Sequence, residues 1–109
     1  MDRRVAQLIE AVRAHSGAVD WNLRRACREL KLDISSAYAA RLFRRDTGVG
    51  IRAYANQQRL LAGTKQLADD DAPVKIIAAG LGYKQPCHLA RFLKKQQFPA
   101  LAAFRKRVS

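Results

Sequence analysis

The chain has 109 residues, 49% of them apolar, and 21 Lys or Arg against 9 Asp or Glu give a formal charge of +12. This length allows one small domain or two very small ones. The apolar content excludes a disordered chain, and the few glycines and prolines exclude a fibrous one. A membrane-spanning chain is excluded because no apolar run nears the roughly 20 residues of a span. Two cysteines are too few for a disulfide-stapled secreted scaffold, and free thiols fit the cytoplasm.

Three short helices are predicted in the first part of the chain. Apolar residues recur at helical spacing over residues 3–14, 22–30 and 35–46. Asp20 and Ser35 are the expected N-caps of the second and third helices, because their side-chain oxygens can accept backbone N–H groups. Three amphipathic helices are enough to enclose a small core.

A longer helix and three further short ones follow. A moderately apolar stretch predicts a helix over residues 52–68, and its expected buried side carries Tyr54, Leu60, Leu61 and Leu67. Short helices are expected over residues 73–81, 86–97 and 99–108, the first capped by one of the acids at 69–71. Strand patterns are lacking. The predicted fold is therefore all-α, with seven helices.

An internal repeat organises these helices. A shift of 50 residues matches residues 39–45 (AARLFRR) to residues 89–95 (LARFLKK), and it pairs Arg41 with Arg91. Each copy contains a short helix, a tight break and a second helix, which is the layout of a helix-turn-helix. The predicted organisation of residues 1–109 is a first subdomain over 3–50, a linker helix over 52–68 and a second subdomain over 70–108, with a small core on either side of the linker.

Helical geometry indicates which side chains face outward. The expected outward positions are Ala37, Ala40, Arg41 and Arg44 in the first copy, and Cys87, Ala90, Arg91 and Lys94, flanked by His88 and Lys95, in the second. Small residues around one arginine permit close approach to a groove, so Arg41 and Arg91 are candidates for guanine contacts, or for phosphates if the pose is shifted. Either arginine can instead be a solvated surface residue; their equivalent places in a repeat favour the binding interpretation.

Positive charge is concentrated in the last third of the chain. Residues 72–109 contain eight Lys or Arg and no Asp or Glu. A polyanion such as nucleic acid is the first explanation, and the second copy is expected to make more of the contacts. The expected phosphate contacts are Arg44, Arg45, Lys94 and Lys95, together with Ser35 at a helix N-terminus and Lys84 in a turn.

Two motifs carry a family resemblance. Residues 35–48 read SSAYAARLFRRDTG, and residues 74–83 read VKIIAAGLGY, followed by HLAR at 88–91 and by Phe and Arg at 104–105. At these spacings the chain resembles, over about residues 5–107, the DNA-binding domain of the AraC/XylS family of bacterial transcription regulators. The resemblance implies two homeodomain-like helix-turn-helix subdomains whose recognition helices enter successive major grooves of double-stranded DNA.

The same resemblance implies site residues and partners. The base-reading positions that it assigns are Ala37, Ala40 and Arg41 in the first motif, and Pro86, Cys87, His88, Ala90 and Arg91 in the second. It further implies RNA polymerase as a protein partner and an effector or dimerisation domain outside this chain. It names neither the DNA target nor the sign of regulation.

Other chemistry finds little support in the sequence. The two histidines and two cysteines lack metal-ligand spacing, so no metal or cofactor is expected, and Cys27 is expected in the core. No catalytic arrangement is present. Two alternatives remain: a basic helical module that binds nucleic acid without sequence preference, and an amphipathic surface-active protein. Short, separately capped helices argue against the second.

Overall fold

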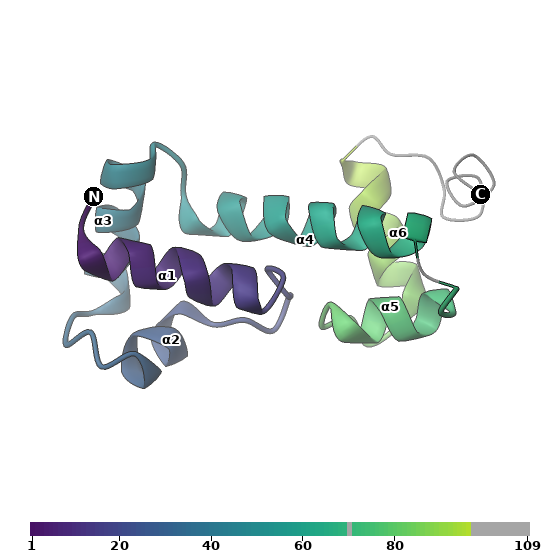
Figure 1. The fold of residues 1–109 in the computed structure, drawn as a ribbon, viewed down its shortest axis with the longest axis horizontal. Coiled ribbons are helices and arrows are strands. Elements are labelled where there is room, and N and C mark those ends of the chain that lie inside the picture. Colours follow the sequence, from purple (N-terminus) through teal and green to yellow (C-terminus); the bar gives the residue numbers. More distant parts are fainter. Residues whose placement is uncertain (70, 97–109) are drawn as a thin grey trace.

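The described part of the chain contains six helices (Figure 1). One of them is long and central, and it joins two small bundles of shorter helices. The structure, a computed structural model, describes residues 1–69 and 71–96. Its helices are α1 (Arg3–Ala14), α2 (Leu23–Glu29), α3 (Ser36–Thr47), α4 (Ile51–Asp69), α5 (Val74–Gly80) and α6 (Pro86–Lys95), and these residues include no strand. The all-α prediction is confirmed, whereas the seventh predicted helix, over residues 99–108, lies outside the described residues. None of the described helices has the length and apolar character needed to cross a membrane.

Each bundle encloses its own core. The first is built by α1, α2 and α3 and buries Val5, Leu8, Ala26, Cys27, Leu32, Ala39, Leu42 and Phe43. The second lies between the end of α4, α5 and α6 and buries Leu67, Ile77, Ala78, Leu81, Leu89 and Leu93. Non-polar burial of this kind is the main stabilising term for small helical domains. The described residues therefore contain two separate cores, and Leu67 near the end of α4 belongs to the second of them.

The buried side of α4 differs from the predicted one. Its buried residues are Arg59, Gly63 and Leu67. Leu61, predicted to be buried, is 57% exposed, so that prediction is wrong. The reason is Gly63: a Cβ there would lie only 3.3 Å from Cδ1 of Leu81, so the helix backbone itself packs against the second core. Leu61 lies about 200° around the helix from Gly63 and is directed to solvent.

The caps of α2 and α3 can be read directly from hydrogen bonds. Asn22 caps α2, since its Oδ1 accepts the backbone N–H of Arg25 at 2.9 Å, and the prediction that Asp20 would do so is wrong. Ser35 caps α3 as predicted, its Oγ accepting the N–H of Tyr38 at 3.1 Å. Asp20 lies too far before the first turn because α2 begins one residue later than the apolar pattern suggests.

The start of α5 is also a correction. Its N-cap is Pro73, which makes no side-chain capping bond, so the prediction of a capping acid is wrong for Asp69 and Asp71, whereas Asp70 lies outside the described residues. The physical reason is the length of the preceding helix, because α4 continues through Asp69 and leaves a short connection. Pro73 supplies a fixed φ that is compatible with helix entry instead.

The cap assignment predicts a difference between two neighbouring substitutions. Asn22→Ala is expected to lower the free energy of unfolding by about 1 kcal/mol, because it removes an acceptor for an otherwise unpaired N–H. Asp20→Ala is expected to change it by no more than about 0.5 kcal/mol. Urea denaturation of both variants checks this, and an equal or larger loss for Asp20→Ala would contradict the assignment.

Candidate nucleic-acid interface

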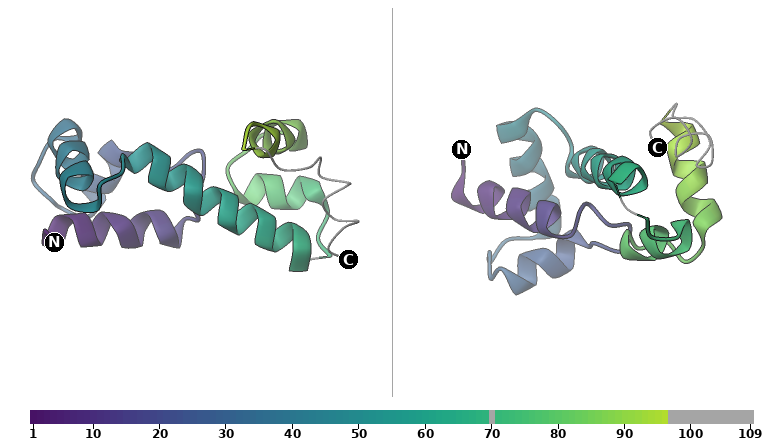
Figure 2. Two further views of the ribbon diagram at one scale, coloured as in Figure 1. Left: turned by 90° about the horizontal axis from the view of Figure 1, so that it is seen from above. Right: turned by 45° about the vertical axis from the view of Figure 1, so that its right-hand side comes forward.

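The second helices of the two repeats lie on the same side of the molecule. In the view from above, α3 and α6 lie along one long edge, at opposite ends of α4 (Figure 2). Each follows a short helix and a turn, α2 before α3 and α5 before α6, so both halves have the helix-turn-helix layout. The described molecule is elongated, 46 × 24 × 20 Å, which separates the two helices along one axis.

The outer face of α3 is polar and open. Ala37, Arg41 and Arg44 are exposed and Ala40 is half-buried, while Leu42 and Phe43 on the opposite face are buried. A shallow groove of 620 Å³ follows this face and is lined by Ala40, Arg41, Arg44, Arg45, Gly50 and Ile51. Ala37, Arg41 and Arg44 are thus outward as predicted, whereas Ala40 is only partly so, and three arginines border one groove.

Tyr38 lies between two arginines at this face. The Cζ atoms of Arg4 and Arg41 are each 5.9 Å from the centroid of its ring, within the range of cation–π attraction. Asp2 holds Arg4 with an Nη2–Oδ2 distance of 2.9 Å, and this hydrogen bonding lowers the pKa of Asp2 to about 2. No pattern in the sequence marks Arg4, because its position beside α3 depends on how α1 packs there.

The outer face of α6 carries the predicted residues of the second motif. Cys87, His88, Arg91, Lys94 and Lys95 are exposed and Ala90 is half-buried. Pro86 occupies the first turn, and Lys84 is exposed in the preceding turn. The Cys87 thiol donates to Oε1 of Gln85 at 3.6 Å. In α3, Arg45 is paired with Asp46 at 3.1 Å; the described part of α6 has no such ion pair, so its cations remain available for a polyanion.

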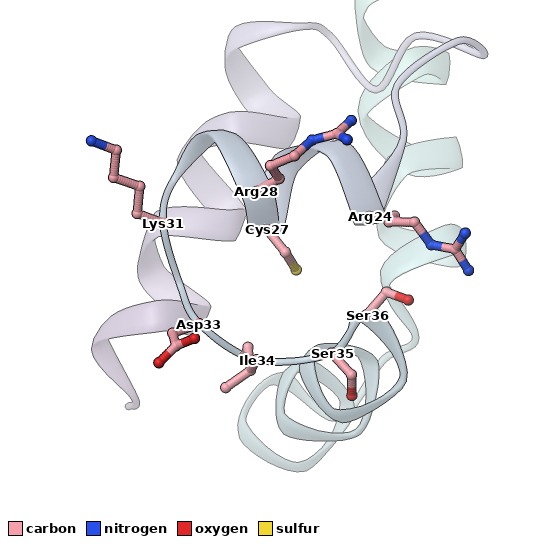
Figure 3. Close-up of a pocket in the computed structure, with 8 residues that line it drawn as sticks. All are labelled: Arg24, Cys27, Arg28, Lys31, Asp33, Ile34, Ser35 and Ser36. Atoms are coloured by element: carbon pink, nitrogen blue, oxygen red, sulfur yellow. The ribbon is translucent and has the colours of Figure 1, made fainter.

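A second basic region lies beside the first motif. A groove of 850 Å³ opens between α2 and the start of α3 (Figure 3), lined by Arg24, Cys27, Arg28, Lys31, Asp33, Ile34, Ser35 and Ser36. Cys27 points into it from α2, and the two serines lie on the opposite side. Arg24, Arg28 and Lys31 are spaced i, i+4, i+7. The first two lie on one face of α2, whereas Lys31 follows the end of that helix at Glu29, so the i, i+4 pair of arginines is the signal that the sequence contains.

The two cysteines have different environments. Cys27 is 6% exposed and belongs to the first core, as predicted, and burial raises the pKa of its thiol, which makes it a poor nucleophile. Cys87 is exposed on α6. Within residues 1–69 and 71–96, no three His, Cys, Asp or Glu side chains are grouped so that they could hold a metal ion.

Comparisons with known sequences agree with the fold. A family model described as a helix-turn-helix domain matches residues 29–107. The regulatory protein PocR of Salmonella typhimurium is 25% identical over 76 residues, which cover 70% of this chain and 25% of PocR. The chain thus spans about a quarter of the length of this curated relative.

Solved structures show the same architecture. The C-terminal domain of AraT, a response regulator from Geobacillus stearothermophilus, superimposes with a TM-score of 0.85 at 18% identity, covering 97% of this chain and 86% of that one. The DNA-binding domain of AdpA, a global transcriptional factor solved in complex with a target DNA, gives a TM-score of 0.80 at 21% identity, covering 97% and 93%. At these identities the likeness establishes the fold.

Proposed function

Because the chain belongs to the helix-turn-helix domain family of AraC-type transcriptional regulators, we propose that it binds specific sequences of double-stranded DNA through α3 and α6. The observation that carries the proposal is that both helices lie on one side of the molecule, each with an exposed central arginine, Arg41 or Arg91. The AdpA domain, which shares this fold, was solved with a target DNA, and this supports the same class of partner.

The residues divide by role. Two helices separated along one axis fit successive major grooves, about 34 Å apart, and arginine pairs with the O6 and N7 atoms of guanine through two hydrogen bonds. Base reading is proposed for Ala37, Ala40, Arg41, Cys87, His88, Ala90 and Arg91. Phosphate contacts, which set register without reading sequence, are proposed for Ser35, Arg44, Arg45, Lys84, Lys94 and Lys95, joined by Arg24, Arg28 and Lys31 from the groove beside α2.

Membership of this family supports a proposed biological role. Regulation of transcription in the bacterial cytoplasm, and not catalysis, is the proposed activity, with promoter or operator DNA as the partner and RNA polymerase as a protein partner. Effector binding or dimerisation is assigned to a domain outside these 109 residues. Pull-down of RNA polymerase on immobilised operator DNA, with and without the protein, tests the second partner.

Selection of binding sites from random duplex DNA tests the main proposal. We expect enrichment of two half-sites whose centres are about 10–10.5 base pairs apart, because both recognition helices engage one side of the duplex. The control is the double variant Arg41→Ala/Arg91→Ala, for which we expect no enriched half-site. Tight binding by the parent protein without any enriched sequence would instead favour a non-specific basic module.

The two central arginines should differ from the basic residues at the helix ends. Arg91→Ala is expected to lose about 1–3 kcal/mol of binding free energy and to relax the preference at one base pair, because a bidentate contact to one base is lost. Arg41→Ala should do the same at the other half-site, with a smaller loss if the second motif makes more of the contacts. Binding to single-base variants of the operator measures both effects.

A matched control is Lys95→Ala, which removes a cation from α6 outside the central reading positions. It should weaken binding to all sequences alike, as loss of a phosphate contact does. If Arg91→Ala behaved in the same way, Arg91 would be a phosphate contact and its assignment to base reading would be overturned.

A further inference from the structure

Arg59 is a buried cation at the junction of the two subdomains. It lies in the middle of α4 with 9% of its surface exposed, and among the described residues it is the one charged or polar residue that is buried. Nothing in its place suggests DNA contact. A buried guanidinium is costly unless it is paired, so its surroundings indicate what it does.

The guanidinium of Arg59 contacts both subdomains. Its Nη1 donates to the carbonyl oxygen of Gly17 at 3.1 Å, in the loop that follows α1, and its Nη2 donates to Oδ1 of Asn56 at 2.6 Å. On the other side, Cζ lies 4.4 Å from the ring centroid of Phe92 in α6 and 5.6 Å from that of Tyr83. One planar group thus connects the first subdomain, the linker helix and the second recognition helix.

The loop that Arg59 holds also touches the second subdomain directly. The N–H of Val19 donates to the carbonyl oxygen of Leu81 at 3.0 Å. Gly17, at φ +60°, packs so closely that an added Cβ would lie 2.0 Å from the carbonyl oxygen of Ala55. At Gly82, with φ +88°, an added Cβ would lie 2.7 Å from Oδ1 of Asp20 and 3.1 Å from the backbone nitrogen of Val19. These contacts connect the loop after α1 directly both to α4 and to the second subdomain.

The details of the site favour orientation over stability. Nε of Arg59 is buried without a hydrogen-bond partner among the described residues, and such an unpaired donor lowers stability. An apolar side chain of similar size would not have this cost. The rigid fork of arginine, in contrast, bonds in one plane and stacks on an aromatic face, so it defines a direction. Phe92 neighbours Arg91 in sequence, so the stacking partner of Arg59 adjoins the proposed reading face of α6.

We propose that Arg59 is a positioning residue that fixes the distance and angle between α3 and α6, and thereby the half-site spacing that the protein accepts. The inference rests on the proposed function for its consequence in DNA binding, but its structural part can be tested without DNA. With a rigid junction, binding of the second helix to its half-site becomes effectively intramolecular once the first helix is bound. A protein with two recognition helices gains affinity in this way.

Spin-label distances test the structural part. Nitroxide labels on native Cys87 and on Ala37→Cys, in a Cys27→Ala background, report the distance between α6 and α3 in the free protein. Arg59→Met keeps the apolar stem but removes the hydrogen bonds and the charge, and we expect a broader and shifted distance distribution. Arg59→Lys keeps the charge without the planar fork and should fall between. Lys65→Ala, an exposed cation on the same helix, is the matched control and should equal the parent.

Binding to operators whose half-sites are moved apart one base pair at a time tests the consequence. The parent should bind one spacing more tightly than the others. In Arg59→Met the ratio of affinities for the preferred and altered spacings should fall about tenfold, while the affinity for an isolated half-site stays the same. Lys65→Ala should retain the preference.

The outcomes separate the two proposals. A folded Arg59→Met protein with the parent's narrow distribution and spacing preference would overturn the positioning role while leaving DNA recognition intact. Loss of helical content in both Arg59 variants would overturn it in favour of a purely structural role. If no DNA sequence is selected at all, the proposed function fails, and the label distances still decide the role of Arg59.

Discussion

Raising the salt concentration from about 50 to about 200 mM is expected to weaken operator binding by roughly 10³–10⁵-fold. The reason is the number of cations on the proposed DNA side. The exposed candidates for phosphate contact among the described residues are Arg24, Arg28, Lys31, Arg44, Arg45, Lys84, Lys94 and Lys95. A protein that neutralises about 6–10 phosphates releases a comparable number of condensed counterions, and binding therefore falls steeply with salt.

Fluorescence anisotropy titrations at several salt concentrations measure this slope. Each phosphate contact contributes about −0.9 to the slope of log affinity against log salt, so Arg28→Ala and Lys94→Ala should each make it shallower by about 1. Lys65→Ala serves as the charge-matched control, with no change expected. A salt-independent affinity would contradict the electrostatic account of the +12 charge.

Truncation at the centre of the first core has the largest expected effect on stability. Phe43→Ala should lower the free energy of unfolding by about 3–5 kcal/mol, because it leaves a cavity under a side chain that is 0% exposed. The ring of Phe43 also meets that of Tyr54, with centroids 5.6 Å apart. Since the free energy of unfolding of native proteins is roughly 5–15 kcal/mol, this substitution would remove a large part of the stability of the first subdomain.

Two probes follow the unfolding of this variant in urea. Trp21, the single tryptophan, packs against the first core, so its fluorescence reports on that subdomain, whereas far-UV circular dichroism reports on all helices. Leu89→Ala is the matched variant in the second core, with an expected cost of about 2–5 kcal/mol. If the contacts of Arg59 couple the subdomains, both probes shift together in both variants. A loss below about 1 kcal/mol for Phe43→Ala would contradict its place in the core.

Family and helix content were predictable from local patterns. The family resemblance inferred from the motifs at residues 35–48 and 74–83 is confirmed by the helix-turn-helix match over residues 29–107. The predicted helix over residues 3–14 coincides with α1, and Ser35 caps α3 as expected. Amphipathic periodicity and capping depend on residues three or four apart, so both can be predicted from a single sequence.

Errors occurred where a helix makes contacts on more than one side. Leu61 was expected to be buried in α4 because it is apolar, yet the buried place belongs to Gly63, where an added Cβ would lie 3.3 Å from Cδ1 of Leu81. Asp20 was expected as a cap, and Asn22 takes that role because of where α2 begins. Hydrophobicity alone predicts neither the buried residue of α4 nor the N-cap of α2, because it depends neither on how closely two backbones approach nor on the residue at which a helix begins.

The sequence by itself determined the six described helices, the inward and outward faces of α3 and α6, the repeat and the family. Only the tertiary structure decided the relation between the two halves, including the shared side of α3 and α6 and the burial of Arg59. The physical reason is the separation of the partners along the chain. Arg59 and Gly17 are 42 residues apart, and the Val19–Leu81 hydrogen bond spans more still, so no local pattern records them. The two helix-turn-helix motifs follow from local chemistry, whereas contacts between the two halves depend on residues far apart in the sequence.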